Sequence, residues 1–167
     1  MEIRVRGDAD LDDLVAVAAR VHEIDNYPIF LPGRDYVGFL SRPQPLAAWV
    51  AVDGSELLGH VALNGATSRP VMRLVDELGL AFSAVYVARL LVDPGSRRRG
   101  VGRRLLEHAR HVAADMGRSA FVDVVDTPTA RPAISLYRRD GWEEIGRVSF
   151  DLVDDQVDEL VFRAPVR

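Results

Sequence analysis

The short segment Arg97-Arg98-Arg99-Gly100-Val101-Gly102 has the residue types of a loop that binds an anion. It follows the apolar run 85–92 and precedes a run with helical spacing, so a strand should lead through it into a helix. Such a loop directs backbone N–H groups and the positive end of a helix toward one point. Gly100 and Gly102 lack a Cβ and allow close approach to the main chain, and the arginines add positive charge. We therefore expect a pyrophosphate ligand.

The residues around this loop narrow the kind of pyrophosphate. A nucleotide-hydrolysing P-loop ends in Gly-Lys-Ser or Gly-Lys-Thr, and this chain contains no lysine. A dinucleotide-binding fold places its glycine-rich turn after the first strand, whereas this loop lies past the midpoint of the chain. Both classes of nucleotide site are therefore disfavoured.

Two motifs in the expected order resemble the GNAT superfamily of acyl-CoA-dependent N-acyltransferases. The first is Gln/Arg-x-x-Gly-x-Gly/Ala after a strand with a Leu-x-Val-x-Pro ending, matched by Arg97, Gly100 and Gly102 after 90–94. The second is Ala-x-x-Leu-Tyr-x-x-x-Gly-Phe/Trp, matched nearly in full by 133–142. The resemblance extends over about residues 3–163, and the pair of motifs is more specific than either alone.

The resemblance implies a cofactor site and a catalytic acid. In the family the pantetheine arm enters between the fourth and fifth strands, here 84–92 and 119–125. The main chain would bind pantetheine and polarise the thioester, and the loop with the start of its helix would hold the pyrophosphate. Tyr137 would protonate the leaving thiolate. The implied cofactor-binding residues are Leu91, Val92, Arg97, Arg98, Arg99, Gly100, Val101, Gly102 and Arg103.

Two departures from the family pattern affect the chemistry. Ala130 stands where the family often has an asparagine that touches the cofactor arm, and Tyr86 stands where many members have a glutamate base. The base must then come from elsewhere, and we consider His60 and Asp123, carboxylates in 66–80, or ordered water. A lone histidine in an apolar run is more often a packed structural residue, and Asp123 would need a partner if buried.

Composition favours one enzyme domain over residues 1–167. The chain has 167 residues with 48% hydrophobic content, no apolar run long enough for a membrane span, and no signal-peptide pattern, which predicts a cytoplasmic protein without a membrane partner. Without cysteines, and with four scattered histidines, no metal site is expected. The net charge of −4 argues against a nucleic-acid partner despite the arginine cluster.

The order of elements predicts an α+β fold with a mixed sheet of about six to seven strands flanked by helices, as the GNAT resemblance also implies. Asp10 is expected to cap the first helix, and the last two strands should surround the acidic turn Asp154-Asp155. The predicted strands cover 3–6, 47–52, 57–64, 84–92, 119–125, 144–152 and 158–164, and the predicted helices follow Asp10 and cover 35–40, 101–116 and 133–139.

The segment 66–80 looks like an insertion before the cofactor strand. Its apolar residues Val71, Leu74, Val75 and Leu78 have helical spacing and should pack against the domain or a second subunit. We predict either a lid over the acceptor or a surface helix that could form a homodimer interface. Carboxylates that could attract a cationic acceptor are Glu23, Asp25, Asp76 and Glu77.

The sequence as a whole predicts an N-acetyltransferase that transfers an acetyl group from acetyl-CoA to a small-molecule or peptide amine by direct attack in a ternary complex. A non-catalytic acyl-CoA-binding sensor or regulatory domain on the same fold is the alternative. Only the enzyme would release coenzyme A in an amine-dependent way.

Overall fold

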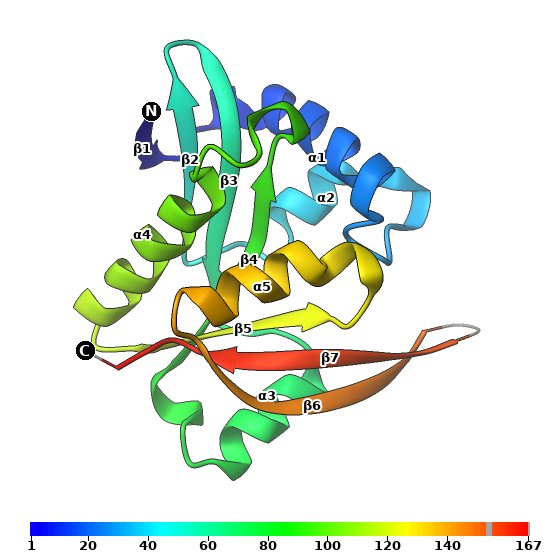
Figure 1. Cartoon of the computed structure of the whole chain (residues 1–167), viewed down its shortest axis with the longest axis vertical. Coiled ribbons are helices and arrows are strands. Elements are labelled where there is room, and N and C mark those ends of the chain that lie inside the picture. The colour runs from blue at the N-terminus through cyan, green and yellow to red at the C-terminus, as the bar shows by residue number, and fades with distance from the viewer. Residues whose placement is uncertain (153–154, 167) are drawn as a thin grey trace. The chain divides into compact units, whose positions relative to one another are not determined.

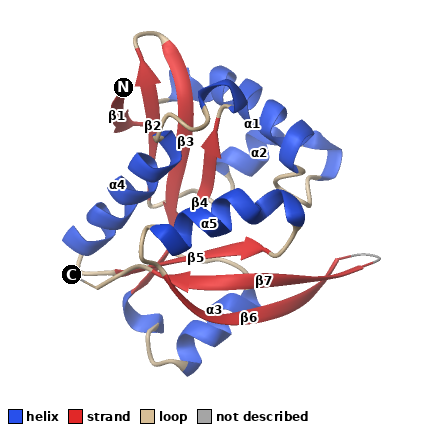
Figure 2. Cartoon of the chain, in the orientation of Figure 1, coloured by secondary structure: helices blue, strands red, loops and turns tan. Residues whose placement is uncertain are grey.

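The computed structural model describes residues 1–152 and 155–166 (Figure 1). Within them lie seven strands and five α-helices, joined by short 3₁₀ turns (Figure 2). The sheet order is β1-β2-β3-β4-β5-β7-β6, with parallel and antiparallel neighbours, so the predicted mixed α+β fold is confirmed. In chain order the elements are β1 Glu2–Val5, α1 Leu11–Asp25, α2 Tyr36–Ser41, β2 Ala47–Asp53, β3 Glu56–Asn64, α3 Arg69–Glu77, β4 Ala84–Val92, α4 Val101–Asp115, β5 Ser119–Val125, α5 Arg131–Arg139, β6 Glu143–Leu152 and β7 Asp155–Arg163.

The chain forms two compact units. The first contains Met1–Asn64 and Arg89–Ala109, and the second contains Gly65–Ala88 and Arg110–Arg167. Each unit builds its own apolar core around strands that bury side chains on both faces.

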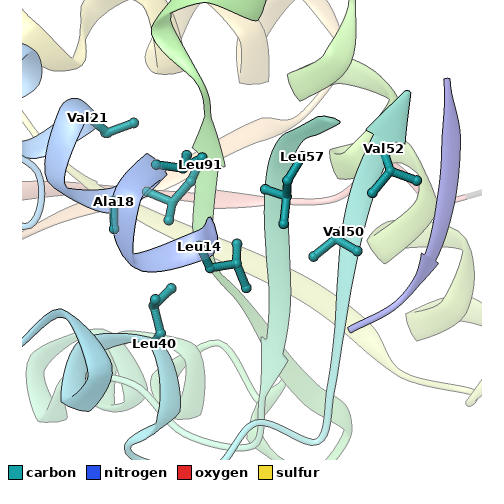
Figure 3. Close-up of a cluster of buried hydrophobic side chains, with 9 residues drawn as sticks. Leu14, Ala18, Val21, Leu40, Val50, Val52, Leu57 and Leu91 are labelled. Atoms are coloured by element: carbon teal, nitrogen blue, oxygen red, sulfur yellow. The ribbon is translucent and has the colours of Figure 1, made fainter. Parts of the chain in front are cut away.

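In the first unit, β2 pairs with β1 and β3 in antiparallel register. Because side chains alternate along a strand, Val50 and Val52 share one face and Trp49 points to the other. Helices α1 and α2 cover the Val50 face in a cluster with Leu57 and Leu91 (Figure 3). The opposite face meets α4, where the Trp49 ring contacts His108 edge-on at 4.9 Å between centroids.

In the second unit, helices cover opposite faces of β7. Val161 joins the apolar cluster with Val71 and Val75 of α3, whereas the adjacent Phe162 contacts Tyr137 of α5. α3 also packs on β6, since a Cβ built at Gly146 would lie 2.8 Å from Leu74. Segment 66–80 thus forms a helix whose residues 71 and 75 are buried as predicted, while Leu78 is exposed.

Two local expectations differ from the structure, and a third falls on residues that it does not describe. Asp10 precedes α1, but its carboxylate caps the preceding turn by accepting from the Gly7 N–H at 2.7 Å, and it binds Arg4. β7 begins at Asp155, earlier than expected, because its pairing with β6 continues to Leu152. Asp154 of the predicted acidic turn lies outside the described residues.

Candidate functional site

Residues 97–102, which we call the cradle, lead from the turn after β4 into α4. The Asp93 carboxylate accepts from the Gly95 N–H at 3.0 Å and so shapes the turn after β4. Gly100 has φ +79°, a left-handed conformation that suits glycine, and its carbonyl accepts from the Arg104 N–H at 3.1 Å as the helix begins. The N–H groups of Val101 and Gly102 precede that first helical bond and have no acceptor within the helix.

The three consecutive arginines have different surroundings. Arg97 donates two hydrogen bonds to Asp25, one of them at 3.2 Å, and Arg99 donates to Asp53 at 3.1 Å. Arg98 is exposed, with φ +61°, and has no ion-pair partner among the residues that the structure describes. Much of the predicted positive charge is thus balanced by aspartates, including Asp25, which the sequence suggested as an attractor of cationic acceptors.

The carboxyl end of β4 lies close against β3. A Cβ built at Gly59 would lie 2.6 Å from the Leu91 carbonyl oxygen, so only glycine permits this backbone approach. The Asp93 N–H donates to the Leu58 carbonyl at 2.9 Å. These contacts fix the backbone of Leu91 and Val92, the predicted pantetheine-binding residues.

Arg89 carries a kink within β4 that the sequence did not predict. Its φ is +54°, which is rare for a residue with a side chain. The buried guanidinium donates to the Pro43 carbonyl at 2.9 Å and the Leu40 carbonyl at 3.3 Å. These bonds satisfy a charged group that would otherwise be costly to bury.

His60, one of the two base candidates, is fully buried on β3. Its Nδ1 lies 2.9 Å from the Arg89 carbonyl, which can only accept, so Nδ1 carries the proton. Burial, with smaller contributions from the positive charges of Arg6 and Arg89, lowers the pKa of His60 to about 4. The imidazole is therefore neutral at pH 7 and serves a packing and hydrogen-bonding role in this structure.

Tyr137, the expected general acid, lies on α5 and is only 4% exposed. Its ring is 5.5 Å from Phe162 and 6.1 Å from Trp142 between centroids, and its carbonyl accepts from the Trp142 N–H at 3.0 Å. α5 ends just before Gly141, whose φ of +79° permits the turn that brings Trp142 back to the helix. The second motif therefore fixes the position of the Tyr137 ring.

Ala130 and Tyr86 stand where the family pattern often has an asparagine and a glutamate. Ala130 precedes α5 and offers no side-chain hydrogen bond. Tyr86 is buried on β4 beside Phe121, with the centroids 6.1 Å apart. Burial and the negative charge of Asp123 raise the pKa of the Tyr86 phenol, so it remains protonated.

Asp123, the other base candidate, has a partner that the sequence analysis missed. It accepts from the Thr67 hydroxyl at 3.1 Å and interacts with the carboxyl group of Glu159 on β7. Glu159 is 8% exposed, and its Oε2 is buried without a hydrogen-bond partner among the described residues. The sequence did contain a signal for this partner. Glu159 lies two residues from both Val157 and Val161, so in a strand it shares their face of the sheet.

Burial controls the protonation of this pair. It raises the pKa of Glu159 to about 8, with a further contribution from the negative charge of Asp123. Burial also raises the pKa of Asp123, against the hydrogen bond from Thr67. The two groups therefore hold a proton between them at neutral pH.

Residues 1–152 and 155–166 contain no group of three or more histidines and acids that could hold a metal ion. No helix in the same ranges is both long and apolar enough to cross a membrane.

Comparison with known proteins gives a family and a set of similar folds. The model of the acetyltransferase (GNAT) family matches residues 15–142. The structure of smu.2055 from Streptococcus mutans UA159 is similar with a TM-score of 0.74 and 18% identity, over 98% of this chain and 98% of that chain. No sequence among curated proteins matches the chain.

Two further solved structures have similar folds. Arabidopsis thaliana NAA60 in complex with acetyl-CoA gives a TM-score of 0.71 and 21% identity, over 97% of this chain and 96% of that chain. The ribosomal-protein-S18-alanine N-acetyltransferase from Escherichia coli gives 0.68 and 17%, over 98% and 92% respectively. At these identities the likeness concerns the fold.

Proposed function

The chain belongs to the GNAT acetyltransferase family, and from this we propose that it transfers the acetyl group of acetyl-CoA directly to an amine. We take residues 1–167 as one N-acetyltransferase domain. The observation that carries the proposal is the cradle before α4, where Gly100 in a left-handed conformation precedes the N–H groups of Val101 and Gly102, which have no acceptor within the helix. This geometry fits a pyrophosphate.

The residues proposed to hold the cofactor fall into two groups. The main chain of β4 would bind the pantetheine arm as a strand binds its neighbour, and an N–H there would polarise the thioester carbonyl. The cradle and its arginines would bind the pyrophosphate, with Arg98 free to move toward it. These residues are Leu91, Val92, Arg97, Arg98, Arg99, Gly100, Val101, Gly102 and Arg103.

Acetyl transfer requires three events at the reacting atoms. The amine must lose a proton and form the new C–N bond, the oxyanion must be stabilised, and the C–S bond must break with a proton passing to the thiolate. We assign the last proton to the Tyr137 hydroxyl. Of the two base candidates, Asp123 is the better, because the only ring nitrogen of His60 able to accept a proton is buried.

The test is release of coenzyme A from acetyl-CoA with a panel of small amines and peptides bearing a free N-terminus. We expect amine-dependent thiol release and an acetylated product by mass spectrometry. Tight binding of acetyl-CoA by calorimetry without turnover of any amine would instead support a sensor or regulatory domain. Failure to bind acetyl-CoA would contradict both.

A further inference from the structure

Asp123 and Glu159 occupy neighbouring positions on one face of the second unit's sheet. In the antiparallel pairing of β5 with β7, Asp123 lies opposite Val161 and Val125 lies opposite Glu159. Opposed residues and residues two apart share a face, so the two acids are diagonal neighbours. Asp123 also comes directly after Val122, the last residue of β5 that pairs with β4.

The surroundings of this carboxyl pair are apolar or hydroxylic. Thr67 and Ser68 at the start of α3 lie on the pair's side, and Thr67 donates to Asp123. Tyr86 of β4 lies close enough to Asp123 for the two groups to interact, and Val148 of β6 lies opposite Glu159. The alternation of β7 places Arg163 on the same face but beyond Val161, and neither acid forms an ion pair with a described residue.

Two features distinguish the pair from a solvated acidic cluster. Glu159 is nine-tenths buried and leaves Oε2 without a hydrogen-bond partner among the described residues. An unpaired buried acceptor costs free energy, and two adjacent acids add repulsion. A bound cation that donates N–H bonds would relieve both costs.

We propose that Asp123 and Glu159 together bind the ammonium group of the acceptor and take its proton before acetyl transfer. The inference rests on the proposed function and names its acceptor as a primary amine that arrives as a cation. It also makes Glu159 a catalytic residue and Thr67 a positioning residue, which holds the Asp123 carboxylate by its hydrogen bond.

The proton balance is complete without another reactant. After the pair has released its shared proton to solvent, the two carboxylates accept N–H bonds from the ammonium group and one proton passes to them. The neutral amine attacks the thioester, the C–N bond forms, and the C–S bond breaks. The thiolate takes up a proton and the amide nitrogen loses one, so each turnover releases one proton to solvent.

The first test measures the carboxyl groups themselves. In protein labelled with ¹³C at Asp and Glu carboxyl carbons, NMR should show one carboxyl group titrating near pH 8, absent in Glu159→Gln. Asp123→Asn should lower that value by about one unit, because the repulsive charge is lost. Thr67→Val should raise the pKa of Asp123, because the hydrogen bond that favours its ionised form is removed. Titration of every carboxyl group below pH 6 would overturn the proposal.

The second test measures the acceptor. With an amine identified by thiol release, Glu159→Gln should raise the KM for the amine about tenfold and leave the KM for acetyl-CoA unchanged. The rise of kcat/KM with pH near 8 should shift to lower pH. Asp158→Asn is the matched control, because it removes an exposed acid from the adjacent position of β7.

The outcomes separate this inference from the proposed function. Absence of thiol release by the unaltered protein with every amine contradicts the acetyltransferase proposal. Normal turnover with unchanged amine KM and pH profile in Glu159→Gln contradicts the role of the pair alone. The variant replaces a carboxyl group that holds a proton at pH 7 with an amide of nearly the same shape, so it should melt close to the temperature of the unaltered protein, and loss of the fold does not explain the loss of activity.

Discussion

The Nδ1 atom of His60 lies 2.9 Å from the carbonyl oxygen of Arg89, and this bond joins a buried imidazole to the kinked residue of β4. The bond fixes the tautomer of His60. It also gives a hydrogen-bond donor to the Arg89 carbonyl oxygen, which the kink would otherwise leave buried without one. His60 therefore supports the backbone that leads into Leu91 and Val92.

The protein should lose stability as the pH is lowered, because His60 is buried in its neutral form. Its pKa is about 4 in the folded protein and about 6.5 in the unfolded chain, so the unfolded state binds more protons between these values. The free energy of unfolding should therefore decrease as pH falls from 6.5 toward 4, by up to about 3 kcal/mol. His60→Leu should remove this part of the slope in urea titrations. His111→Gln, on the partly exposed α4, should keep it.

Gly102→Val should weaken acetyl-CoA binding about tenfold or more, because a side chain in the first turn of α4 keeps phosphate from the helix N–H groups. Gly102 is the better test of the two glycines, since Gly100 has φ +79° and a substitution there also strains the backbone. Calorimetry measures the affinity, with thermal melting as the check on folding. Normal acetyl-CoA binding by a folded Gly102→Val variant would contradict the proposal that this loop binds the pyrophosphate.

Arg98→Gln and Arg99→Gln remove the same charge from adjacent positions and form a matched pair. Arg98 has no ion-pair partner in the described part of the chain, whereas Arg99 binds Asp53 at 3.1 Å. We expect Arg98→Gln to weaken acetyl-CoA binding by about tenfold and Arg99→Gln by less. Equal losses in calorimetry would mean that the Asp53 pair opens on binding.

Tyr137→Phe should lower kcat by roughly 10²-fold and leave acetyl-CoA affinity nearly unchanged, because only the proton donor is lost. The remaining ring still fills the space beside Phe162 and Trp142. Tyr36→Phe on α2 is the control for loss of a hydroxyl elsewhere. An unchanged kcat, with chemistry shown to limit the rate, rules out the assigned role.

Asp76→Ala combined with Glu77→Ala should raise the KM for a cationic amine about threefold if α3 helps to attract the acceptor. Both side chains are exposed, while residues 71 and 75 hold the helix to its unit. Asp12→Ala with Asp13→Ala removes two exposed carboxylates from α1 as a control. An unaltered acceptor KM would assign segment 66–80 a structural or subunit-interface role.

Local patterns predicted the bounds of several elements. β4 and β5 have the predicted bounds, because an apolar run rich in valine ends at Asp93 and at Asp126. Glycines after α4 and α5 mark the ends of these helices in the sequence and have positive φ in the structure. Each signal depends only on neighbouring residues.

The missed features depend on residues far apart in the chain. Glu159 meets Asp123 through the β5–β7 register, and Arg97 meets Asp25 across 72 positions. The Arg89 kink is stabilised by carbonyl groups of residues 40 and 43. No local spacing predicts such contacts, since they follow from how the elements pack.

The arginine–aspartate pairs around the cradle have a consequence for self-modification. A guanidinium group keeps its proton at any physiological pH and is not a nucleophile, whereas a lysine amine near bound acetyl-CoA would be an acetyl acceptor. The chain has 21 arginines and no lysine. The side chains that surround the proposed acyl donor are therefore inert toward it, and intact-mass spectra after incubation with acetyl-CoA should show no side-chain amide adducts.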